Sequence, residues 1–191
     1  GLSKNCFLVL LVGRLIPQKG IYEFMKLSEI FEKEYKFNIH FLLIAPEEKK
    51  SNISIPVSKI NDHQNNFSNF TWIPFAKDIR PFYESCSISI LPSFYKEGGH
   101  PRAILEAMAF GKPVISSNTP EARGPIKNNY NGYLVRPKDI KDLKNKIFRF
   151  LKDESLCKEM GKNSLKKVIH EYSDIDQLQK VLSYINSLRI I

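Results

Sequence analysis

The segment at residues 13–20, Gly-Arg-Leu-Ile-Pro-Gln-Lys-Gly, combines two cations with two glycines. Arg14 offers a planar fork of N–H donors that matches phosphate oxygens, and Lys19 adds a mobile point charge. Gly13 and Gly20 let the backbone approach a ligand closely, and a helix starting here would supply free N–H groups. The segment predicts a pyrophosphate-binding loop, with a surface turn carrying solvated charges as the alternative. It is neither a P-loop nor a Gly-x-Gly-x-x-Gly dinucleotide loop.

A second group of polar residues lies further along the chain. Glu97 precedes the glycine pair Gly98 and Gly99, and Glu106 lies inside the predicted helix that follows. Each carboxylate can accept hydrogen bonds from two hydroxyl groups, which suits a sugar and a ribose. The glycine backbone and the helix N-terminus can donate to hydroxyls and phosphates. His100 can donate to the same ligand or be a solvated loop residue. The alternative for the whole group is a helix-initiating loop with acids placed for the helix dipole.

Both groups need a scaffold, and the apolar pattern predicts one. Continuous apolar segments predict strands at residues 6–12, 38–45, 69–75, 87–91, 114–117 and 133–135. Helical spacing of apolar residues predicts helices at 21–31, 78–83, 102–110 and from residue 139 onward. Strands alternating with helices indicate an α/β fold, with a Rossmann-like doubly wound parallel sheet followed by C-terminal helices. Such sheets bind ligands beyond the carboxyl ends of their strands, where both groups fall.

Three finer features complete the predicted scaffold. Residues 47–69 are polar and predict an irregular connection that holds at most one short strand. Asp78 is expected to cap a short helix. Gly161 and the pair Ser173 and Asp174 are expected to break the C-terminal region into three helices.

Composition and charge narrow the function classes. The 191 residues carry a formal net charge of +9, which favours anionic partners: phosphate-bearing ligands, anionic lipid headgroups or nucleic acid. No nucleic-acid-binding motif is present, so nucleic acid is not expected. The cysteines, Cys6, Cys86 and Cys157, are odd in number and far apart, which argues against a disulfide framework and favours a reducing compartment. No Cys or His cluster has metal-ligand spacing.

The two groups of polar residues, in this order, resemble a known family. They are similar to the donor-binding, C-terminal domain of the retaining GT-B-fold glycosyltransferases called group 1. That family carries a Gly-Arg-Leu…Lys-Gly loop after the first strand of its second domain, as at residues 13–20. It also carries Pro-Ser…Glu-Gly…Leu-Glu-Ala-Met-Ala-x-Gly-x-Pro-Val, as at residues 92–114, and a later Asn-Gly-x-Leu-Val, as at residues 131–135.

The resemblance implies a role for each residue. Arg14 and Lys19 would bind the donor pyrophosphate and stabilise the leaving nucleoside diphosphate. Glu106 would hold the ribose hydroxyls, and Glu97 would face the transferred sugar. Catalytic roles would fall to Glu97, Arg14 and Lys19. The expected donor-binding set is Gly13, Arg14, Lys19, Gly98, Gly99, His100, Leu105 and Glu106.

The implied enzyme is a hexosyltransferase that retains anomeric configuration and acts on a hydroxyl acceptor of a polysaccharide, lipid-linked glycan or glycoconjugate. A UDP-sugar is the first expectation for the donor, and no metal or cofactor is expected because protein cations would replace the metal. Residues 1–191 would form the donor domain, with residues 174–191 a helix bracing a missing N-terminal acceptor domain. The half alone would be inactive or weakly active. Its expected location is cytoplasmic, peripheral at the inner face of an anionic membrane.

Two departures from the family pattern are visible. Eight residues separate Glu97 from Glu106 where the family usually has seven, so the turn at residues 98–100 either absorbs a bulge or moves Glu97. Residues 120–125 lack the acidic residue that commonly follows the arginine-like position. The alternative to an enzyme is a non-enzymatic domain that binds a nucleotide sugar or another anionic ligand.

Overall fold

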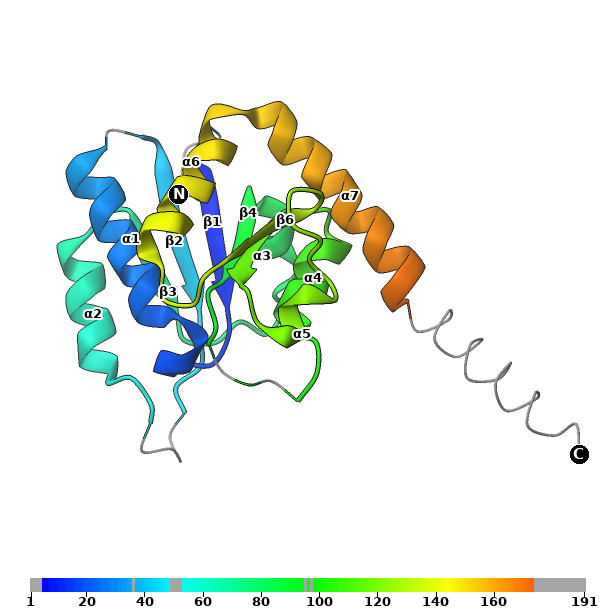
Figure 1. Cartoon of the computed structure of the whole chain (residues 1–191). Helices are drawn as coiled ribbons and strands as arrows, with labels where there is room; N and C mark the ends of the chain where they lie inside the picture. The colour runs from blue at the N-terminus through cyan, green and yellow to red at the C-terminus, as the bar shows by residue number, and fades with distance from the viewer. Residues whose placement is uncertain (1–4, 36, 49–52, 95, 97, 174–191) are drawn as a thin grey trace, which may run out of the picture.

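The computed structural model describes residues 5–35, 37–48, 53–94, 96 and 98–173, and Figure 1 shows their arrangement. Its centre is a six-stranded parallel sheet with the strand order β3-β2-β1-β4-β5-β6. The strands are β1 (Phe7–Val12), β2 (Ile39–Ile44), β3 (Phe70–Ile73), β4 (Ile88–Leu91), β5 (Val114–Ser117) and β6 (Gly132–Val135). Each strand falls within or beside an apolar segment of the sequence, and the predicted α/β fold is confirmed.

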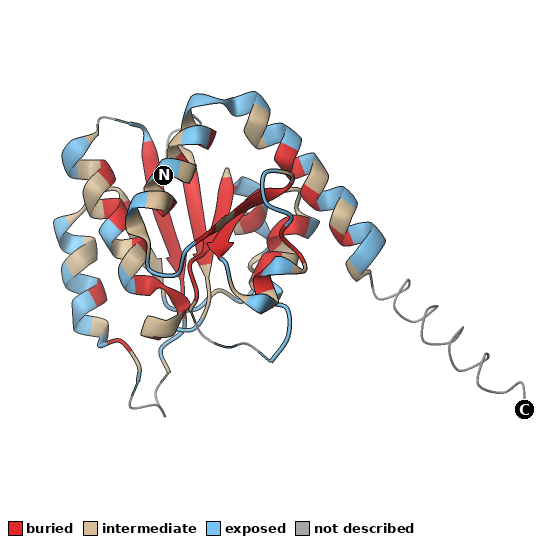
Figure 2. Ribbon diagram, viewed as in Figure 1, coloured by how far each residue is buried: buried red, intermediate tan, exposed pale blue. Residues whose placement is uncertain are grey.

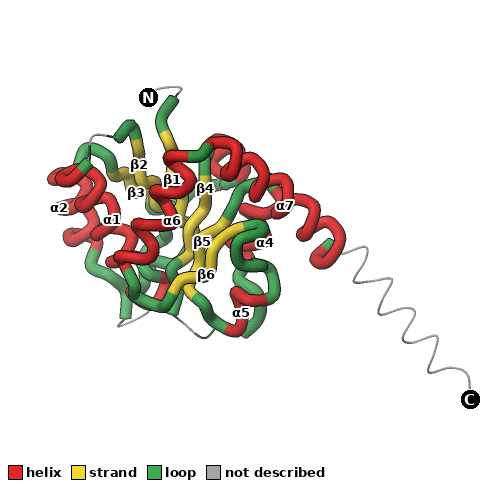
Figure 3. Tube along the Cα trace, turned by 45° about the horizontal axis from the view of Figure 1, so that its top comes forward, coloured by secondary structure: helices red, strands yellow, loops and turns green. Residues whose placement is uncertain are grey.

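Helices cover both faces of this sheet, which explains why its central strands are apolar on both sides. One core lies between the sheet and the inner faces of α1 (Ile21–Glu34), α2 (Val57–Asn66) and α6 (Ile140–Lys152). A second core lies under α3 (Arg80–Ser85), α4 (Arg102–Ala109), α5 (Pro120–Arg123) and α7 (Glu154–Tyr172). Figure 2 shows the strands buried between these layers while the outer helix faces are exposed. In the tilted view of Figure 3, α7 lies beside α4, and the two helices pack together.

The connection between β2 and β3 differs from the prediction, because residues 57–66 form α2 rather than irregular chain. Ile60 is buried and Val57 is partly buried against the core, and the other eight residues of this helix are polar or charged. The helix is held by tertiary contacts instead: His63 Nε2 lies 2.7 Å from Ser28 Oγ on α1. Because most residues of α2 are polar, the apolar pattern of the sequence did not predict this helix.

Gly161 does not break the C-terminal region, since α7 runs through it from Glu154 to Tyr172. A Cβ atom at Gly161 would lie 2.2 Å from the Gly111 carbonyl oxygen, so the glycine serves close helix packing rather than termination. Asp78 was predicted to cap a short helix, but it lies one residue before the cap position. Ile79 occupies the cap position of α3, while Asp78 accepts the Arg80 backbone N–H at 3.0 Å.

Residues 174–191, predicted as a bracing helix, lie outside the described residues. Within the described part of the chain, no helix is both long and apolar enough to cross a membrane.

Candidate functional site

The strand order places the two predicted groups of residues together. β1 and β4 are neighbours, although β1 connects onward to β2 on one side and β4 to β5 on the other. In an open α/β sheet, such a reversal leaves a crevice beyond the carboxyl ends of the two central strands. The Gly13–Gly20 loop follows β1, and the segment with Glu106 follows β4. Both groups therefore reach one edge of the sheet.

Direct hydrogen bonds join the two loops. The Gln18 carbonyl oxygen accepts the backbone N–H of Phe94 at 3.0 Å and the Ser93 hydroxyl at 3.1 Å. Gln18 lies in a 3-10 turn, η1 (Pro17–Lys19), whose start is fixed by the buried Leu15 and Ile16. The loop after β4 is thus anchored to a rigid part of the loop after β1.

Gly20 permits this contact. Its φ of 76° lies in the left-handed region that favours glycine. A Cβ atom there would lie 2.5 Å from both the carbonyl oxygen and the ring Cγ of Pro92. Gly20 is therefore required by its backbone conformation and by the approach of the β4 loop, and it ends η1 where α1 begins.

The two predicted cations occupy different environments in this loop. The Arg14 side chain is 47% exposed, and its guanidinium lies 3.6 Å from the Glu48 carboxylate. Lys19 is only 8% exposed. Its Cγ lies 3.6 Å from the position of a Cβ built on Gly13, so the lysine stem covers that glycine. The structure therefore brings together Gly13, Arg14 and Lys19, and adds Glu48, which the sequence reasoning missed.

The second group is described from Gly98 onward, because Glu97 lies outside the described residues. Gly98 and Gly99 are exposed, and a Cβ on either would meet no atom within 4 Å. Residues 98–100 form a bend ahead of α4, and the effect of the extra residue on Glu97 stays a prediction. Pro101 caps α4 without a side-chain hydrogen bond, and a helix start leaves N–H groups free of intrahelical partners. The open turn and helix start can receive an anionic ligand.

The side chain of His100, predicted as a ligand donor or a solvated loop residue, is exposed and contacts two neighbouring helices. Its Nδ1 donates to the Glu121 carbonyl oxygen of α5 at 2.7 Å. Its ring lies edge-on to Tyr172 of α7 with 5.3 Å between centroids, and a Cβ on Gly124 would collide with it. The imidazole is thus packed toward α5 and α7, and the backbone of His100 is the part that stays with the glycine turn.

Glu106 is oriented by a residue that the sequence reasoning did not assign to the site. Tyr83, fully buried on α3, has two acceptors within reach of its single hydroxyl proton: Glu106 Oε2 at 3.2 Å and the Ala103 carbonyl oxygen at 3.3 Å. Burial, together with the Glu106 charge, raises the pKa of Tyr83, so its hydroxyl remains a donor. Arg102 lies 3.6 Å from the other oxygen, Oε1. The side chain of Glu106 remains 30% exposed, so it can still accept a ligand hydroxyl. No sequence signal links Tyr83 to Glu106, because the contact depends on the packing of α3 against α4.

Two apolar residues complete this part of the edge. Leu105 packs against the core on the α4 side of the sheet and positions the helix rather than offering a polar contact. Phe75 follows β3 and is 74% exposed, the highest exposure among the large apolar side chains described. Since α3 contacts Glu106 through Tyr83, the segment between β3 and α3 borders the same region. Phe75 was predicted only as the end of a strand.

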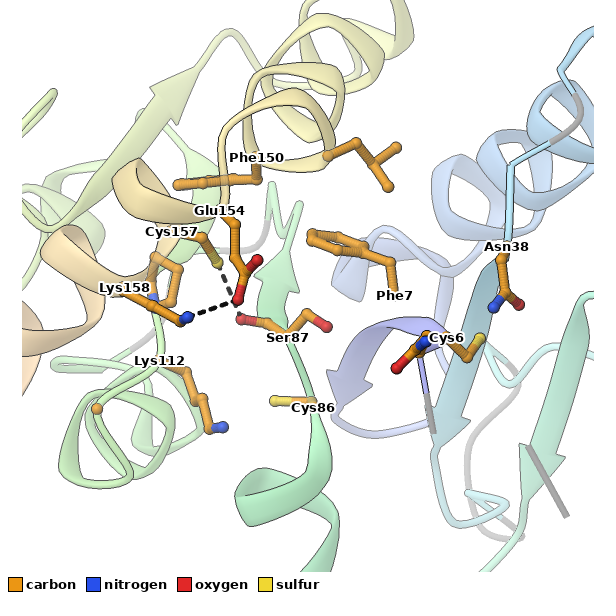
Figure 4. A pocket seen from close by; sticks show the side chains of 14 residues that line it. Cys6, Phe7, Asn38, Cys86, Ser87, Lys112, Phe150, Glu154, Cys157 and Lys158 are labelled. Carbon is orange, nitrogen blue, oxygen red and sulfur yellow. Dashed lines mark hydrogen bonds and ion pairs between the residues drawn. The ribbon is translucent and has the colours of Figure 1, made fainter. Parts of the chain in front are cut away.

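A cavity of about 570 Å³ lies at the opposite, amino edge of the sheet. All three cysteines line it, as Figure 4 shows with the Lys158–Glu154 ion pair on its wall. Burial raises the pKa of Cys86 to about 12 and that of Cys157 to about 11, so neither thiol is an activated nucleophile. Among the described residues, no group of three or more His, Cys, Asp or Glu side chains could hold a metal ion. The fold thus gathers cysteines that are distant in sequence without building reactive chemistry.

Known proteins are similar to this chain in sequence and in fold. A family model described as "Glycosyl transferases group 1" matches residues 1–167. A UDP-Gal:alpha-D-GlcNAc-diphosphoundecaprenol alpha-1,3-galactosyltransferase from Escherichia coli is 26% identical over 182 residues, which cover 95% of this chain and 46% of the relative. An N,N'-diacetylbacillosaminyl-diphospho-undecaprenol alpha-1,3-N-acetylgalactosaminyltransferase from Campylobacter jejuni is 31% identical over 157 residues, covering 82% and 39%.

A solved structure of Alr3699/HepE from Anabaena, in complex with UDP, superposes with a TM-score of 0.82 at 20% identity. The match covers 96% of this chain and 49% of that one, and at this identity it shows the shared fold. The chain spans less than half the length of these relatives. The family match, which extends over both predicted groups of residues, decides the classification: this chain belongs to the group 1 glycosyltransferases.

Proposed function

We propose that this chain is the nucleotide-sugar-binding half of a two-domain enzyme that transfers a sugar to a hydroxyl acceptor. The observation that carries the proposal is the junction at Gln18, whose carbonyl oxygen binds both Phe94 and Ser93. This junction fixes the cationic β1 loop beside the open glycine turn after β4, at the point where an α/β sheet accepts a ligand.

The arrangement supports an orientation for the donor. Arg14 and Lys19 hold the pyrophosphate, and their charge stabilises the nucleoside diphosphate as it leaves. Glu106, held by Tyr83, binds the ribose. The base then extends toward the segment between β3 and α3, where Phe75 offers an exposed aromatic face. The sugar lies at Gly98 and Gly99, whose surroundings are open.

The finer parts of the proposal rest on the family and its relatives. A UDP-sugar is the proposed donor, supported by the UDP complex of the similar Anabaena protein. Two relatives are named for substrates on diphospho-undecaprenol carriers, which supports a lipid-linked glycan as acceptor. The proposal also includes three features of the reaction and one of the site. The enzyme transfers a hexose, retains the anomeric configuration and binds the donor without a metal, and Glu97 contacts the sugar. The acceptor would be held by a further, N-terminal domain.

Calorimetric titration with UDP-, GDP- and ADP-sugars tests donor binding. Saturable binding to one nucleotide class is expected. Arg14→Ala should weaken it about 10- to 100-fold, because a charge-assisted contact to phosphate is lost. Arg149→Ala, an exposed arginine on α6, is the matched control and should leave the affinity unchanged. Equal losses in the two variants would contradict the assigned site.

Glu106→Gln extends this test to the ribose end. Loss of the charge should weaken binding about tenfold, while Glu154→Gln at the amino edge should have no effect. Sugar transfer by a chain that also carries the acceptor domain would separate an enzyme from a binding domain without activity. Failure of this two-domain protein to transfer any sugar, despite donor binding, would exclude the enzyme.

A further inference from the structure

The outer face of α7 combines basic and aliphatic side chains. Lys158, Lys162, Leu165 and Ile169 follow one another at spacings of four, three and four, so they lie along one face of the helix. Leu165 is 39% exposed and Ile169 is 52% exposed, which is unusual for large aliphatic residues. Lys166 is exposed beside them. We call these five residues the α7 face.

The charge of this surface is positive along most of the helix. Between Met160 and His170 the sequence contains three lysines and no acidic residue. α7 has three acids: Glu154 pairs with Lys158, Glu171 pairs with Lys167, and the exposed Glu159 lies just before Met160. Among the described residues, Lys162 and Lys166 form no ion pair, so these two lysines give the middle of the helix its positive charge.

A shallow hollow of about 220 Å³ borders the α7 face. Lys127 and Tyr130, from the turn before β6, form its other wall, and the Lys127 ammonium lies 5.2 Å from the Tyr130 ring centre. Asn163 on α7 donates to the Tyr130 carbonyl oxygen at 2.9 Å and fixes this turn against the helix. Lys166 and His170 line the same hollow. Lys167 and Glu171, which form an ion pair, also line it. Three lysines and one acid thus border a space of the size of a phosphate headgroup.

We infer that the α7 face and this hollow form a docking surface for an anionic lipid bilayer. Lysines interleaved with aliphatic side chains on one helix face suit the interface of a membrane, where ammonium groups meet headgroup phosphates and aliphatic groups enter the acyl boundary. A small soluble anion would use the lysines but would leave Leu165 and Ile169 in water. Charge complementarity and the exposed aliphatic pair together favour the bilayer.

The position of α7 gives this surface a consequence for the site. The helix starts near the amino edge, where Cys157 and Lys158 line the cavity, and its last residue, Tyr172, contacts His100 in the turn before α4. A bilayer along α7 would therefore reach the glycine turn, at the end of the crevice assigned to the sugar. This consequence rests on the proposed function, whereas the docking surface itself does not.

Flotation with vesicles tests the inference on the full chain without nucleotide. Recovery with phosphatidylcholine vesicles that contain phosphatidylglycerol is expected at low salt, with little recovery on pure phosphatidylcholine. Lys162→Glu with Lys166→Glu should lower the partition coefficient about tenfold or more. Lys33→Glu with Lys59→Glu makes the same charge change on the exposed faces of α1 and α2 and should lower it much less.

A second pair of variants tests the aliphatic contribution. Leu165→Gln with Ile169→Gln should lower the partition coefficient about fivefold at unchanged net charge. Tyr22→Gln with Ile53→Gln changes two residues of similar exposure elsewhere and should leave it unchanged. Equal losses in target and control pairs, or no recovery of the wild type, would overturn the inference. Loss in the lysine pair alone would also overturn it, since that result describes an anion site and not a membrane surface. Titration with UDP, done separately, keeps this outcome distinct from failure of the donor site.

Discussion

The two edges of the sheet differ in the relation between cavity and chemistry. The amino edge has a cavity of about 570 Å³ whose thiols have raised pKa values. Its charged residues are the ion pair of Glu154 and Lys158, and Lys112, which donates to the Glu84 carbonyl oxygen. The carboxyl edge has loops joined at Gln18, a cation covering a glycine, and a carboxylate held by a buried tyrosine. Under the proposed function, the enclosed volume is therefore a poor guide to the site, and the polar groups at the strand reversal are the better guide.

Substitution of Gly20 is expected to have the largest effect on the carboxyl edge. Gly20→Ala should lower the free energy of unfolding by about 3 kcal/mol, because alanine would adopt a left-handed conformation and collide with Pro92. Chemical denaturation measures this change, and donor binding should be lost with it. Gly99→Ala, where a Cβ has open space, should change stability by less than about 0.5 kcal/mol. Similar losses in both variants would show that the loop junction is not the rigid part of the edge.

Removal of the Tyr83 hydroxyl should have the next largest effect. Tyr83→Phe leaves Glu106 Oε2 without its buried donor, and donor affinity should fall about fivefold with a stability loss of about 1 kcal/mol. Tyr133→Phe is the control, because the Tyr133 hydroxyl is buried with no hydrogen-bond partner among the described residues. That change should be neutral or slightly stabilising. Calorimetry and thermal unfolding measure both quantities, and an unchanged donor affinity in Tyr83→Phe would remove Tyr83 from the site.

Truncation at the amino edge should affect stability but not donor binding. Cys157→Ala removes a partly buried thiol and should cost about 1 kcal/mol of unfolding free energy. Donor affinity should stay within about twofold of the wild type, as measured by calorimetry. A marked loss of donor affinity would show that the two edges are coupled. It would contradict the expectation that the amino edge affects stability alone.

The smallest effect should be the change in the free energy of unfolding with pH. It depends on two histidines that lie outside the groups compared above. Burial lowers the pKa of His40 and of His63, against the opposing charge of Glu32. The unfolded chain therefore binds protons more readily, so stability is complete above the ordinary histidine pKa of about 6.5 and falls as the pH drops below it. Urea unfolding between about pH 7 and pH 5 measures the slope. His63→Gln should flatten it, and an unchanged slope in this variant would exclude His63 as a cause.

The sequence predicted the sheet well because its strands are buried on both faces and read as apolar runs. It failed at α2, whose apolar residues are only Val57 and Ile60, and at Gly161, where a close contact with Gly111 explains the glycine. In the site, Arg14, Lys19 and Glu106 were found through their motifs and lie at the predicted edge. Tyr83 and Glu48 were missed because their contacts join residues that are distant in the chain. The direction of the His100 ring depends on α5 and α7, which no local pattern specifies.

The junction at Gln18 also has a consequence for folding. Gln18 and Ser93 are 75 positions apart in sequence, and the strands that bring them together are parallel neighbours. Contacts of such separation form late, because a long loop must be closed before they gain any stabilisation. A nascent chain that ends before β4 would hold Arg14 and Lys19 without the loop that completes their site. The chain should therefore bind nucleotide only when β4 has paired with β1. Nucleotide binding during refolding would then report that this strand pairing has formed.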